Sequence, residues 1–320
     1  MRPLPRSARH RLNERTARIN RPGRHHGFVV IDKPAGWTSH DVVSRVRALL
    51  GERRVGHAGT LDPAATGVLP IAVGDATRVI EYLAAASKTY LAEVTFGITT
   101  DSADGDGRVT RVENATGLLA DTIESALVQF EGEIEQIPPM HSAIRVGGKR
   151  LYELARAGKT VERTPRQVYI SRADLISWVA PRATIEVDCS KGTYIRSLAQ
   201  DLGNFLGTGA YLSNLVRTRT GCFVLDEAWT LRELCAELGS ASWSDIASHS
   251  DTILMEWPAL LLDEVEATNW RHGRDVSSTG AASGMVRAYD NHGEWLGVGQ
   301  GQVNAEESCW LPQKVVGGAA

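Results

Sequence analysis

The sequence predicts an α+β protein that ends in a small β-rich module. Two stretches, Lys88–Phe96 and Ile185–Cys189, alternate apolar and polar residues as half-buried strands do. Apolar residues recur at helical spacing between Val42 and Leu50 and again between Ile123 and Phe130. From about Met255 onward, short apolar pieces separated by turn residues replace these patterns. The chain therefore mixes helices and strands before it changes mainly to strands.

The composition is that of a globular protein with room for two domains. The chain has 320 residues, of which 42% are hydrophobic and 23% are charged. This length exceeds one typical domain. The net charge of -3 does not by itself suggest binding to a polyanion. Such binding needs a local basic face and not a basic average.

The cysteine pattern and the apolar runs indicate the compartment. Cys189, Cys222, Cys235 and Cys309 show neither a CxxC pair nor regular spacing, so neither a metal site nor a disulfide framework is indicated. Such usage fits a reducing cytoplasm best. No apolar run approaches the ~18 residues that span a bilayer, so we expect no contact with a membrane.

The first 26 residues are predicted to be a basic, disordered arm. They hold eight arginines against a single acid, Glu14, and too few apolar residues to fold alone. An arm attracted to phosphate is one interpretation. An extension without a specific role, such as one from a wrongly chosen start codon, is the other, and both remain open.

A strand and a helix are predicted to follow. Phe28–Ile31 is a short apolar run that ends before Pro34, as a buried strand leading into a turn does. Ser39 occupies the expected N-cap position of the helix that continues to Leu50, and Gly51 ends this helix. Arginines on or beside its polar side form either a solvated face or part of an RNA track.

The stretch Gly56–Pro70 is the one around which the chain is organised. Asp62 is its only carboxylate, in a frame of glycines, prolines and small residues. Glycines allow a ligand to approach the main chain closely. Because the frame carries so little other charge, we expect it to present one reactive acid in an enclosed pocket and not to be an ordinary Asp-Pro turn.

Further elements follow in order. Val68–Val73 is strand-like, and Asp75 or Thr77 is expected to cap the helix after it. Tyr90 lies in the strand at 88–96, where it is either a core aromatic or a ring that faces a ligand. The acid-rich stretch 100–107 lacks the distal glutamate of a calcium loop, so a tight turn between two strands is favoured.

The segment at about 138–166 is the densest basic run outside the arm. It includes Lys149 and Arg150 beside two glycines. Cations suit phosphates and glycines give mobility, so we interpret this segment as an RNA-gripping insertion.

A strand-to-helix corner follows this insertion. Strand 185–189 changes to a helix after Gly192-Thr193, and Arg196 lies near the start of that helix. Such a corner holds side chains firmly beside a cleft. Residues 231–250 are predicted to form a helix and a linker.

The C-terminal pieces predict several strands at close spacing. They are Ala259–Leu262, Gly284–Tyr289 and Leu296–Gly301, and Asn291-His292-Gly293 has the composition of a hairpin turn. The prediction is a small β-barrel-like module, with a purely structural cap as the competing interpretation.

Six ordered blocks together resemble the TruB family of tRNA pseudouridine-55 synthases. The central block is Gly-His-Ala-Gly-Thr-Leu-Asp-Pro-Ala-Ala-Thr-Gly-Val-Leu-Pro at 56–70. The others are Val30–Ser39, Gly74–Arg78 with Lys88–Tyr90, Pro138–Ala143, Gly148–Glu153 and Lys191–Arg196. These blocks are spread in the family's order over roughly two thirds of the chain, which is hard to obtain by chance, whereas a single short motif is not. One departure is Ala58, where the family commonly has threonine.

The resemblance implies a fold and a domain plan. The fold would be a mixed, largely antiparallel central sheet flanked by helices. Residues 27–250 would form the catalytic domain, and 251–320 a PUA-like RNA-binding domain.

The resemblance also implies the reaction and the residues that perform it. A specific uridine of tRNA, position 55 in the T loop, would be flipped out and isomerised to pseudouridine without a cofactor. Asp62 would be the catalytic aspartate and Arg196 would pair with it. Tyr90 would lie against the uracil base. Residues expected to contact the substrate are His57, Tyr194, Leu215, Lys33, Lys149 and Arg150.

Elementary chemistry supports the pairing of Asp62 with Arg196. A carboxylate must be ionised to act as nucleophile or base, and burial opposes this. An arginine beside it keeps it charged. Three actions of Asp62 remain open: attack at C1′, addition to the uracil ring and removal of the C2′ proton.

Two other functions compete with this one. The first is a non-catalytic RNA-binding or tRNA-folding protein of the same architecture. The second is an enzyme acting on a small nucleoside or sugar, which would need a second acid near the first; no such acid is evident from the sequence. We expect a monomer whose partner is the T stem-loop of tRNA, with no obligatory protein partner.

Overall fold

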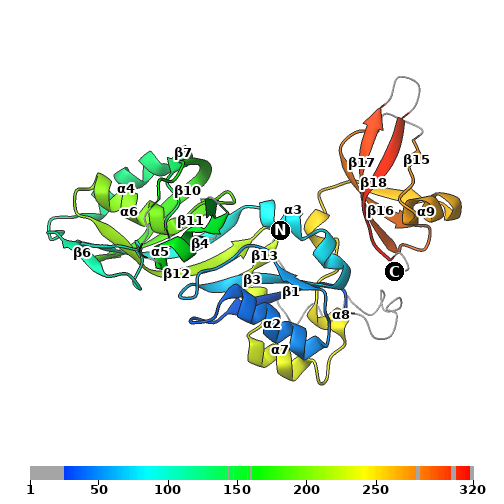
Figure 1. Ribbon diagram of the computed structural model, residues 1–320, viewed down its shortest axis with the longest axis horizontal. Coiled ribbons are helices and arrows are strands. Elements are labelled where there is room, and N and C mark those ends of the chain that lie inside the picture. Colours follow the sequence, from blue (N-terminus) through cyan, green and yellow to red (C-terminus); the bar gives the residue numbers. More distant parts are fainter. Residues whose placement is uncertain are drawn as a thin grey trace.

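The computed structural model describes residues 25–317 except 141, 143, 147, 157, 159, 160, 279–281 and 304–307. The predicted basic arm therefore lies almost entirely outside the described residues. The described chain forms an elongated body, with the C-terminal sheet, coloured orange to red, at one end (Figure 1).

A nine-stranded sheet forms the centre of the larger part, in the order β1-β3-β12-β4-β11-β10-β7 with β2 beside β3 and β13 beside β12. Its strands are β1 (Gly27–Lys33), β2 (Val55–His57), β3 (Thr66–Val73), β4 (Lys88–Phe96), β7 (Gly132–Gln136), β10 (Arg166–Val179), β11 (Arg182–Cys189), β12 (Ala210–Thr220) and β13 (Phe223–Val224). Neighbours run antiparallel except β3 and β12, which pair in parallel at Val216↔Thr66 and Arg217↔Gly67. The prediction of a mixed, largely antiparallel sheet is confirmed.

Helices cover the sheet in two groups. Helices α4 (Ala120–Leu127) and α6 (Ile195–Phe205) bury their apolar residues against β4, β10, β11 and β12. Helices α2 (Ser39–Leu50), α7 (Leu231–Glu237) and α8 (Trp243–Ile246) pack against β1 and β3. Because successive strand residues point to opposite faces, each group of helices packs against every second side chain of its own strands.

The C-terminal part is a separate five-stranded sheet in the order β14-β16-β17-β18-β15. Its elements are β14 (Ala259–Leu262), α9 (Glu264–Arg271), β15 (Val276–Ser277), β16 (Met285–Asp290), β17 (Trp295–Val303) and β18 (Ser308–Val315). The predicted β-rich module is present, and Asn291–Gly293 lies between β16 and β17 as expected. Helix α9 was not predicted, although Asp263 and Glu266 form a capping box at its start.

The two sheets share one apolar cluster. Trp295 and Val298 of the C-terminal sheet pack with Phe28 of β1 and Leu83 of α3 (Ile80–Ala85). An ion pair of 2.9 Å between Lys314 and Glu81 crosses the same junction. The C-terminal sheet is therefore docked on the larger part by buried contacts.

Two predicted helix caps are wrong. Thr38, and not Ser39, caps α2, and its side chain accepts a hydrogen bond from the Asp41 amide at 3.1 Å. Helix α3 begins at Ile80 without a side-chain cap, because residues 74–78 form a 3-10 turn first. In that turn Asp75 pairs instead with Arg54 at 3.0 Å.

Two insertions interrupt the sheet. Strands β5 (Ile98–Thr100) and β6 (Val109–Val112) form a hairpin, and the predicted turn lies between them. The basic segment contains β8 (Arg145–Val146), β9 (Lys149–Arg150) and α5 (Leu151–Arg156). The side chains of Lys149 and Arg150 lie outside what the structure describes.

Candidate active site

The loop that carries Asp62 connects β2 to β3, and its backbone is held on both sides of the acid. Before it, the Leu61 amide donates to the Ser39 hydroxyl at 2.9 Å, and this hydroxyl lies 3.2 Å from the Leu61 carbonyl. After it, the Pro63 carbonyl accepts from the Lys33 ammonium at 3.1 Å and from the Gly36 amide at 2.8 Å. The main chain of the loop is therefore fixed while the Asp62 side chain is 46% exposed.

Arg196 joins Asp62 to a second carboxylate. Its Nε atom lies 3.1 Å from Asp62 Oδ2, and an Nη atom lies 3.1 Å from Asp104 Oδ2. The arginine side chain is only 5% exposed, and it comes from the first turn of α6. Asp104 comes from the turn between β5 and β6. Three segments far apart in sequence thus meet at one guanidinium.

The surroundings push the pKa of Asp62 in opposite directions. Burial raises the pKa of this carboxyl above its usual value, and the Arg196 guanidinium opposes the rise. The Asp104 carboxylate adds to the rise because like charges disfavour ionisation. Without Arg196, burial and the Asp104 charge would keep Asp62 protonated up to a higher pH.

Tyr90 lies beside this pair, on the face of the sheet that α6 covers. It is 7% exposed and belongs to the same apolar cluster as Leu61. Burial raises the pKa of its hydroxyl and the Asp62 charge adds to the rise, while the Arg217 guanidinium lowers it. The carboxylate, the arginine and the phenol thus share one site.

Three family models match consecutive parts of the chain. Residues 47–195 match the TruB family pseudouridylate synthase N-terminal domain. Residues 196–254 match the tRNA pseudouridylate synthase B C-terminal domain, and 258–307 match the C-terminal domain of pseudouridine synthase II TruB.

Curated relatives match over most of their length. A protein of Pseudomonas fluorescens named tRNA pseudouridine synthase B is 44% identical over 86% of this chain and 91% of its own. One of Symbiobacterium thermophilum with the same name is 55% identical over 66% of this chain and 71% of its own. The chain belongs to the TruB family.

Two solved structures resemble this chain over most of its length. A chain of a Cbf5-Nop10-Gar1 complex superposes with a TM-score of 0.70 at 26% identity, over 91% of this chain and 85% of that one. A chain from an H/ACA RNP bound to a substrate RNA has a TM-score of 0.68 at 23% identity, over 94% of this chain and 92% of that one, which shows a shared fold.

Lys33, expected to contact the substrate of this TruB enzyme, occupies a different position. It is fully buried, and its ammonium lies within hydrogen-bonding distance of the carbonyls of Pro34, Trp37 and Pro63 at 3.0, 2.7 and 3.1 Å. Burial lowers its pKa to about 8. With its donors used inside the protein, Lys33 supports the loop and does not reach a phosphate.

Of the predicted contact residues, His57 ends β2, Tyr194 precedes the first residue of α6, and Leu215 lies in the middle of β12. Tyr194 caps α6, and its amide donates to the Gln136 side chain at 2.9 Å. Leu215 of β12 pairs with Ala92 of β4, which lies two residues from Tyr90 on the same strand. The Nδ1 atom of His57 is buried without a hydrogen-bond partner among the described residues, and burial lowers the pKa of this imidazole.

The expectation of no second acid near Asp62 is wrong. Asp104 lies in a turn whose acid content was visible, but no sequence pattern indicates that the turn folds back onto Arg196. Sequence reasoning also missed the contact of Ser39 with Leu61 and the contacts of Arg217 with Gly59 and Val68. Within the described ranges, no group of three or more His, Cys, Asp or Glu could hold a metal ion.

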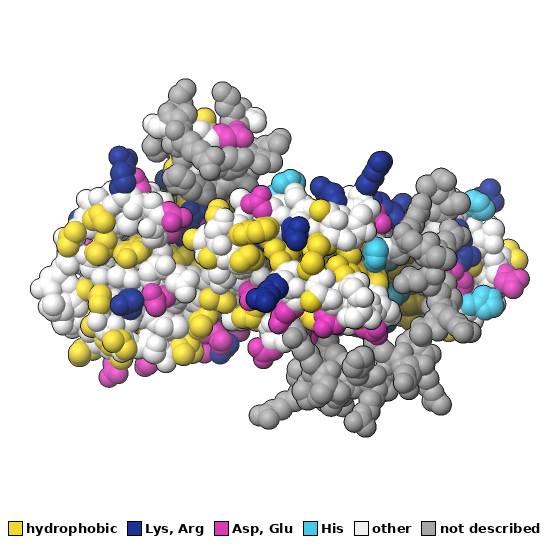
Figure 2. Space-filling view, turned by 90° about the horizontal axis from the view of Figure 1, so that it is seen from below, with side chains coloured by type: hydrophobic (Ala, Val, Ile, Leu, Met, Phe, Trp, Pro, Cys, Tyr) yellow, Lys and Arg dark blue, Asp and Glu magenta, His cyan; other side chains and the backbone are white. Residues whose placement is uncertain are grey.

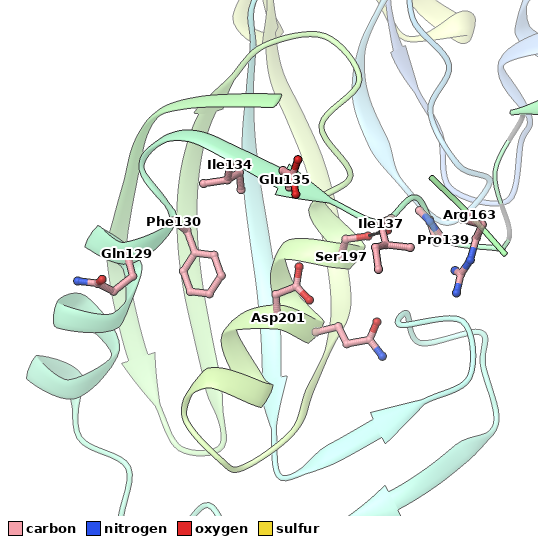
Figure 3. Close-up of a pocket in the computed structure, with 10 residues that line it drawn as sticks. Gln129, Phe130, Ile134, Glu135, Ile137, Pro139, Arg163, Ser197 and Asp201 are labelled. Atoms are coloured by element: carbon pink, nitrogen blue, oxygen red, sulfur yellow. Dashed lines mark hydrogen bonds between the residues drawn. The ribbon is translucent and has the colours of Figure 1, made fainter. Parts of the chain in front are cut away.

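A cavity of about 500 Å³ lies apart from this TruB site (Figure 3). It opens between β7, α6 and the end of α4, and its walls include Phe130, Ile134, Ser197 and Asp201. Figure 3 shows the Asp201 carboxylate pointing into it. Asp62, Tyr90 and Arg196 do not line this cavity.

The surface is not uniformly basic. Figure 2 shows one face on which Lys and Arg side chains are spread among acidic and apolar ones. The two most basic segments, 1–26 and 138–166, are largely or partly outside the described residues. No helix in the described chain is long and apolar enough to cross a membrane.

Proposed function

We propose that this protein converts a uridine of tRNA into pseudouridine, at position 55 in the T loop. The observation that carries this proposal is the ion pair of Asp62 with Arg196 at 3.1 Å, in a loop whose backbone is fixed on both sides of the acid. Relatives that match most of the chain are named tRNA pseudouridine synthase B. The enzyme is an isomerase.

Asp62 is the reacting group in this proposal. The reaction breaks the bond between ribose C1′ and uracil N1, turns the base and joins C1′ to C5. Arg196 holds the carboxylate ionised and oriented, and its second partner Asp104 limits how far the guanidinium can turn. Half exposure of Asp62 leaves room for a nucleotide to reach it.

The uridine must leave its stack before it can reach Asp62. Extruding a base costs a few kcal/mol, which protein contacts offset. Tyr90 presents an aromatic face to the base, and Tyr194 and Leu215 form further walls. We assign His57 to the RNA beside the extruded base, because its neutral ring has a buried nitrogen without a partner among the described residues.

Phosphate contacts are assigned to the basic insertion at 138–166, with Lys149 and Arg150, and RNA binding to the C-terminal sheet. We also propose that the catalytic domain ends at residue 250 and that the C-terminal RNA-binding domain begins at residue 251. The cytoplasmic location and the monomeric state stay predictions from the sequence, as does a role for the arm at 1–26.

The test is a turnover assay on an unmodified T-arm stem-loop, with the product nucleotide mapped. We expect stoichiometric conversion at position 55 and none in a stem-loop that carries cytidine there. Tight binding without conversion would instead support the non-catalytic RNA-binding function. Conversion only at another uridine would keep the enzyme class and reject the assigned position.

A further inference from the structure

Gln136 is a buried polar residue that the mechanism above does not use. It is the last residue of β7, the edge strand of the nine-stranded sheet, where it pairs with Arg166 of β10. Only 2% of the residue is exposed. A buried amide costs free energy unless its donor and its acceptor are hydrogen-bonded, so its partners indicate its role.

Both partners of the Gln136 amide belong to one residue, Tyr194. The Tyr194 amide donates to Gln136 Oε1 at 2.9 Å, and Gln136 Nε2 donates to the Tyr194 carbonyl at 3.3 Å. The side chain thus binds the backbone of Tyr194 much as a residue of a neighbouring strand would. One residue after Gln136, the Ile137 carbonyl accepts from the Ser197 hydroxyl at 3.1 Å (Figure 3).

These contacts hold the chain on both sides of Arg196. Helix α6 begins at Ile195, and Tyr194 at its N-cap position makes no side-chain hydrogen bond to the helix. The first N–H groups of a helix have no partner within it, so they need partners elsewhere. In α6, contacts with the end of β7 and with Ile137 fix the first turn in place of a side-chain cap.

Arg196 depends on the position of this turn. Its Nε atom lies 3.1 Å from Asp62 Oδ2, and an Nη atom lies 3.1 Å from Asp104 Oδ2. Because the side chain is long, a small rotation of the turn moves the guanidinium at its tip. A displacement of about 1 Å in a catalytic site can cost about a hundredfold in rate.

The basic insertion at 138–166 starts at the same point. The chain leaves the sheet after Gln136 and returns to it at Arg166, and these two residues are paired. Arg163 donates to the Pro138 carbonyl at 3.0 Å, which ties the two ends of the insertion together. The contacts of Gln136 and Ile137 therefore join the base of the insertion to the first turn of α6.

We propose that Gln136 is a positioning residue for Arg196 and that it joins the base of the insertion at 138–166 to the active site. This inference rests on the proposed function, in which Arg196 keeps Asp62 ionised and oriented. Gln136 need not touch the uridine in this role, because it acts through the backbone of Tyr194. The Ser197 hydroxyl supports the same turn of α6.

Gln136→Met tests this role, because it keeps the length of the side chain and removes both hydrogen bonds to Tyr194. We expect the single-turnover rate on the unmodified stem-loop to fall by about tenfold or more. RNA affinity should change by less than about twofold, since the substitution lowers the rate and not the binding. The acidic limb of the pH–rate profile should move to higher pH, because Arg196 lowers the pKa of Asp62 and a displaced Arg196 lowers it less.

The acidic limb reports on Arg196 because the substitution leaves the other charged residues around Asp62 in place. The pKa of Asp62 also responds to the charges of Asp104, Lys33 and Asp106. None of these three is hydrogen-bonded to Gln136 in the described part of the chain. A glutamine that served stability alone would lower the melting temperature of the variant without moving this limb.

Two controls separate positioning from general effects. Gln200→Met makes the same change on α6, at an amide that has no hydrogen-bond partner among the described residues, and should keep the rate and the limb. Thr230→Ala removes the cap of α7, which packs in a different apolar cluster from α6. It should lower the melting temperature and keep the rate.

Ser197→Ala covers a Gln136 variant that fails to fold. It removes one hydrogen bond to Ile137, so we expect a smaller loss of rate and a shift of the acidic limb in the same direction. An unmoved limb in Ser197→Ala and in folded Gln136→Met would overturn the inference, as would a wild-type rate in Gln136→Met. If wild type itself shows no turnover, the proposed function fails, which is distinct from failure of the Gln136 role.

Discussion

In the proposed function Asp62 is the reacting residue, and its environment is a compromise between access and ionisation. A fully buried carboxyl would remain protonated, whereas a fully exposed one could not exclude water from the reaction. The structure leaves the Asp62 side chain 46% exposed and places a nearly buried arginine against it. At the residue scale, the balance between these two side chains sets the fraction of active enzyme.

Asp62→Asn should abolish turnover, with a loss of more than about a thousandfold, because an amide cannot serve as nucleophile or base. RNA affinity should stay within about twofold, since the amide keeps the shape of the side chain. Single-turnover assays and filter binding measure the two quantities. Asp106→Asn, in the exposed part of the turn that carries Asp104, is the control and should keep most of the activity. Substantial turnover by Asp62→Asn would reject the assignment.

Asp62→Asn should also make the protein more stable at neutral pH. The folded pKa of Asp62 is raised mainly by burial, so the folded state binds this proton more tightly than the unfolded state does. Stability from this group is therefore present at low pH and is lost as pH rises from the ordinary value of 3.8 through the raised folded pKa. Urea midpoints should favour the variant at pH 7, and the difference should shrink as pH falls toward 3.8. A variant less stable than wild type at pH 7 would contradict this account.

At the scale of elements, the start of α2 has two adjacent hydroxyls with different tasks. Thr38 caps the helix and lies at the surface, whereas Ser39 is buried and binds both backbone groups of Leu61. One hydroxyl therefore serves the helix and the other serves the catalytic loop. Sequence patterns identified a cap here but could not separate the two, because the partner of Ser39 is 22 residues away.

Thr38→Ala and Ser39→Ala should separate these tasks. Losing the cap costs about 1 kcal/mol of stability. Losing Ser39 leaves the buried Leu61 groups unpaired, at about 1–3 kcal/mol. Both variants should have lower urea midpoints, but only Ser39→Ala should lower the single-turnover rate, by about tenfold, because its loss loosens the residue before Asp62. Equal rates in the two variants would show that the hydroxyl of Ser39 serves stability alone.

At the scale of the whole molecule, the two sheets are joined by a shared apolar cluster and by the ion pair of Lys314 with Glu81 at 2.9 Å. The C-terminal sheet is therefore held against the nine-stranded sheet by buried apolar contacts and an ion pair. Because the chain carries a net charge of -3, attraction to RNA must come from local groups.

Lys149→Glu together with Arg150→Glu should weaken RNA binding, and the slope of log affinity against log salt should fall by about 1 for each phosphate that the protein no longer neutralises. Binding across a salt series measures this slope. The single-turnover rate at saturating enzyme should change little. Arg232→Glu, on the exposed side of α7, is the control and should leave the slope unchanged. An unchanged slope in the double variant would remove the insertion from the phosphate contacts.

The sequence by itself determined the parts that depend on short-range order. Alternation predicted β4 and β11, and the glycine and proline frame around Asp62 singled out the loop that we propose to be catalytic. Backbone freedom, strand alternation and helix spacing are local properties, so they can be recognised in one chain. The order of the motifs along the chain also indicated the TruB family, which implies a fold and a class of reaction.

The family resemblance had already paired Asp62 with Arg196, and the structure brings these two together. Only the tertiary structure decided the other contacts between distant groups. Sequence reasoning placed Lys33 against the substrate and found no second acid, whereas folding buries Lys33 under the loop and brings Asp104 onto Arg196. No sequence pattern assigned Arg217 a role of its own, because the Gly59 carbonyl that it binds and the Tyr90 residue opposite it lie on other segments of the chain. The contact of Arg196 with Asp104 joins residues 92 positions apart and that of Arg217 with Gly59 joins residues 158 apart, and a linear pattern does not encode such pairings.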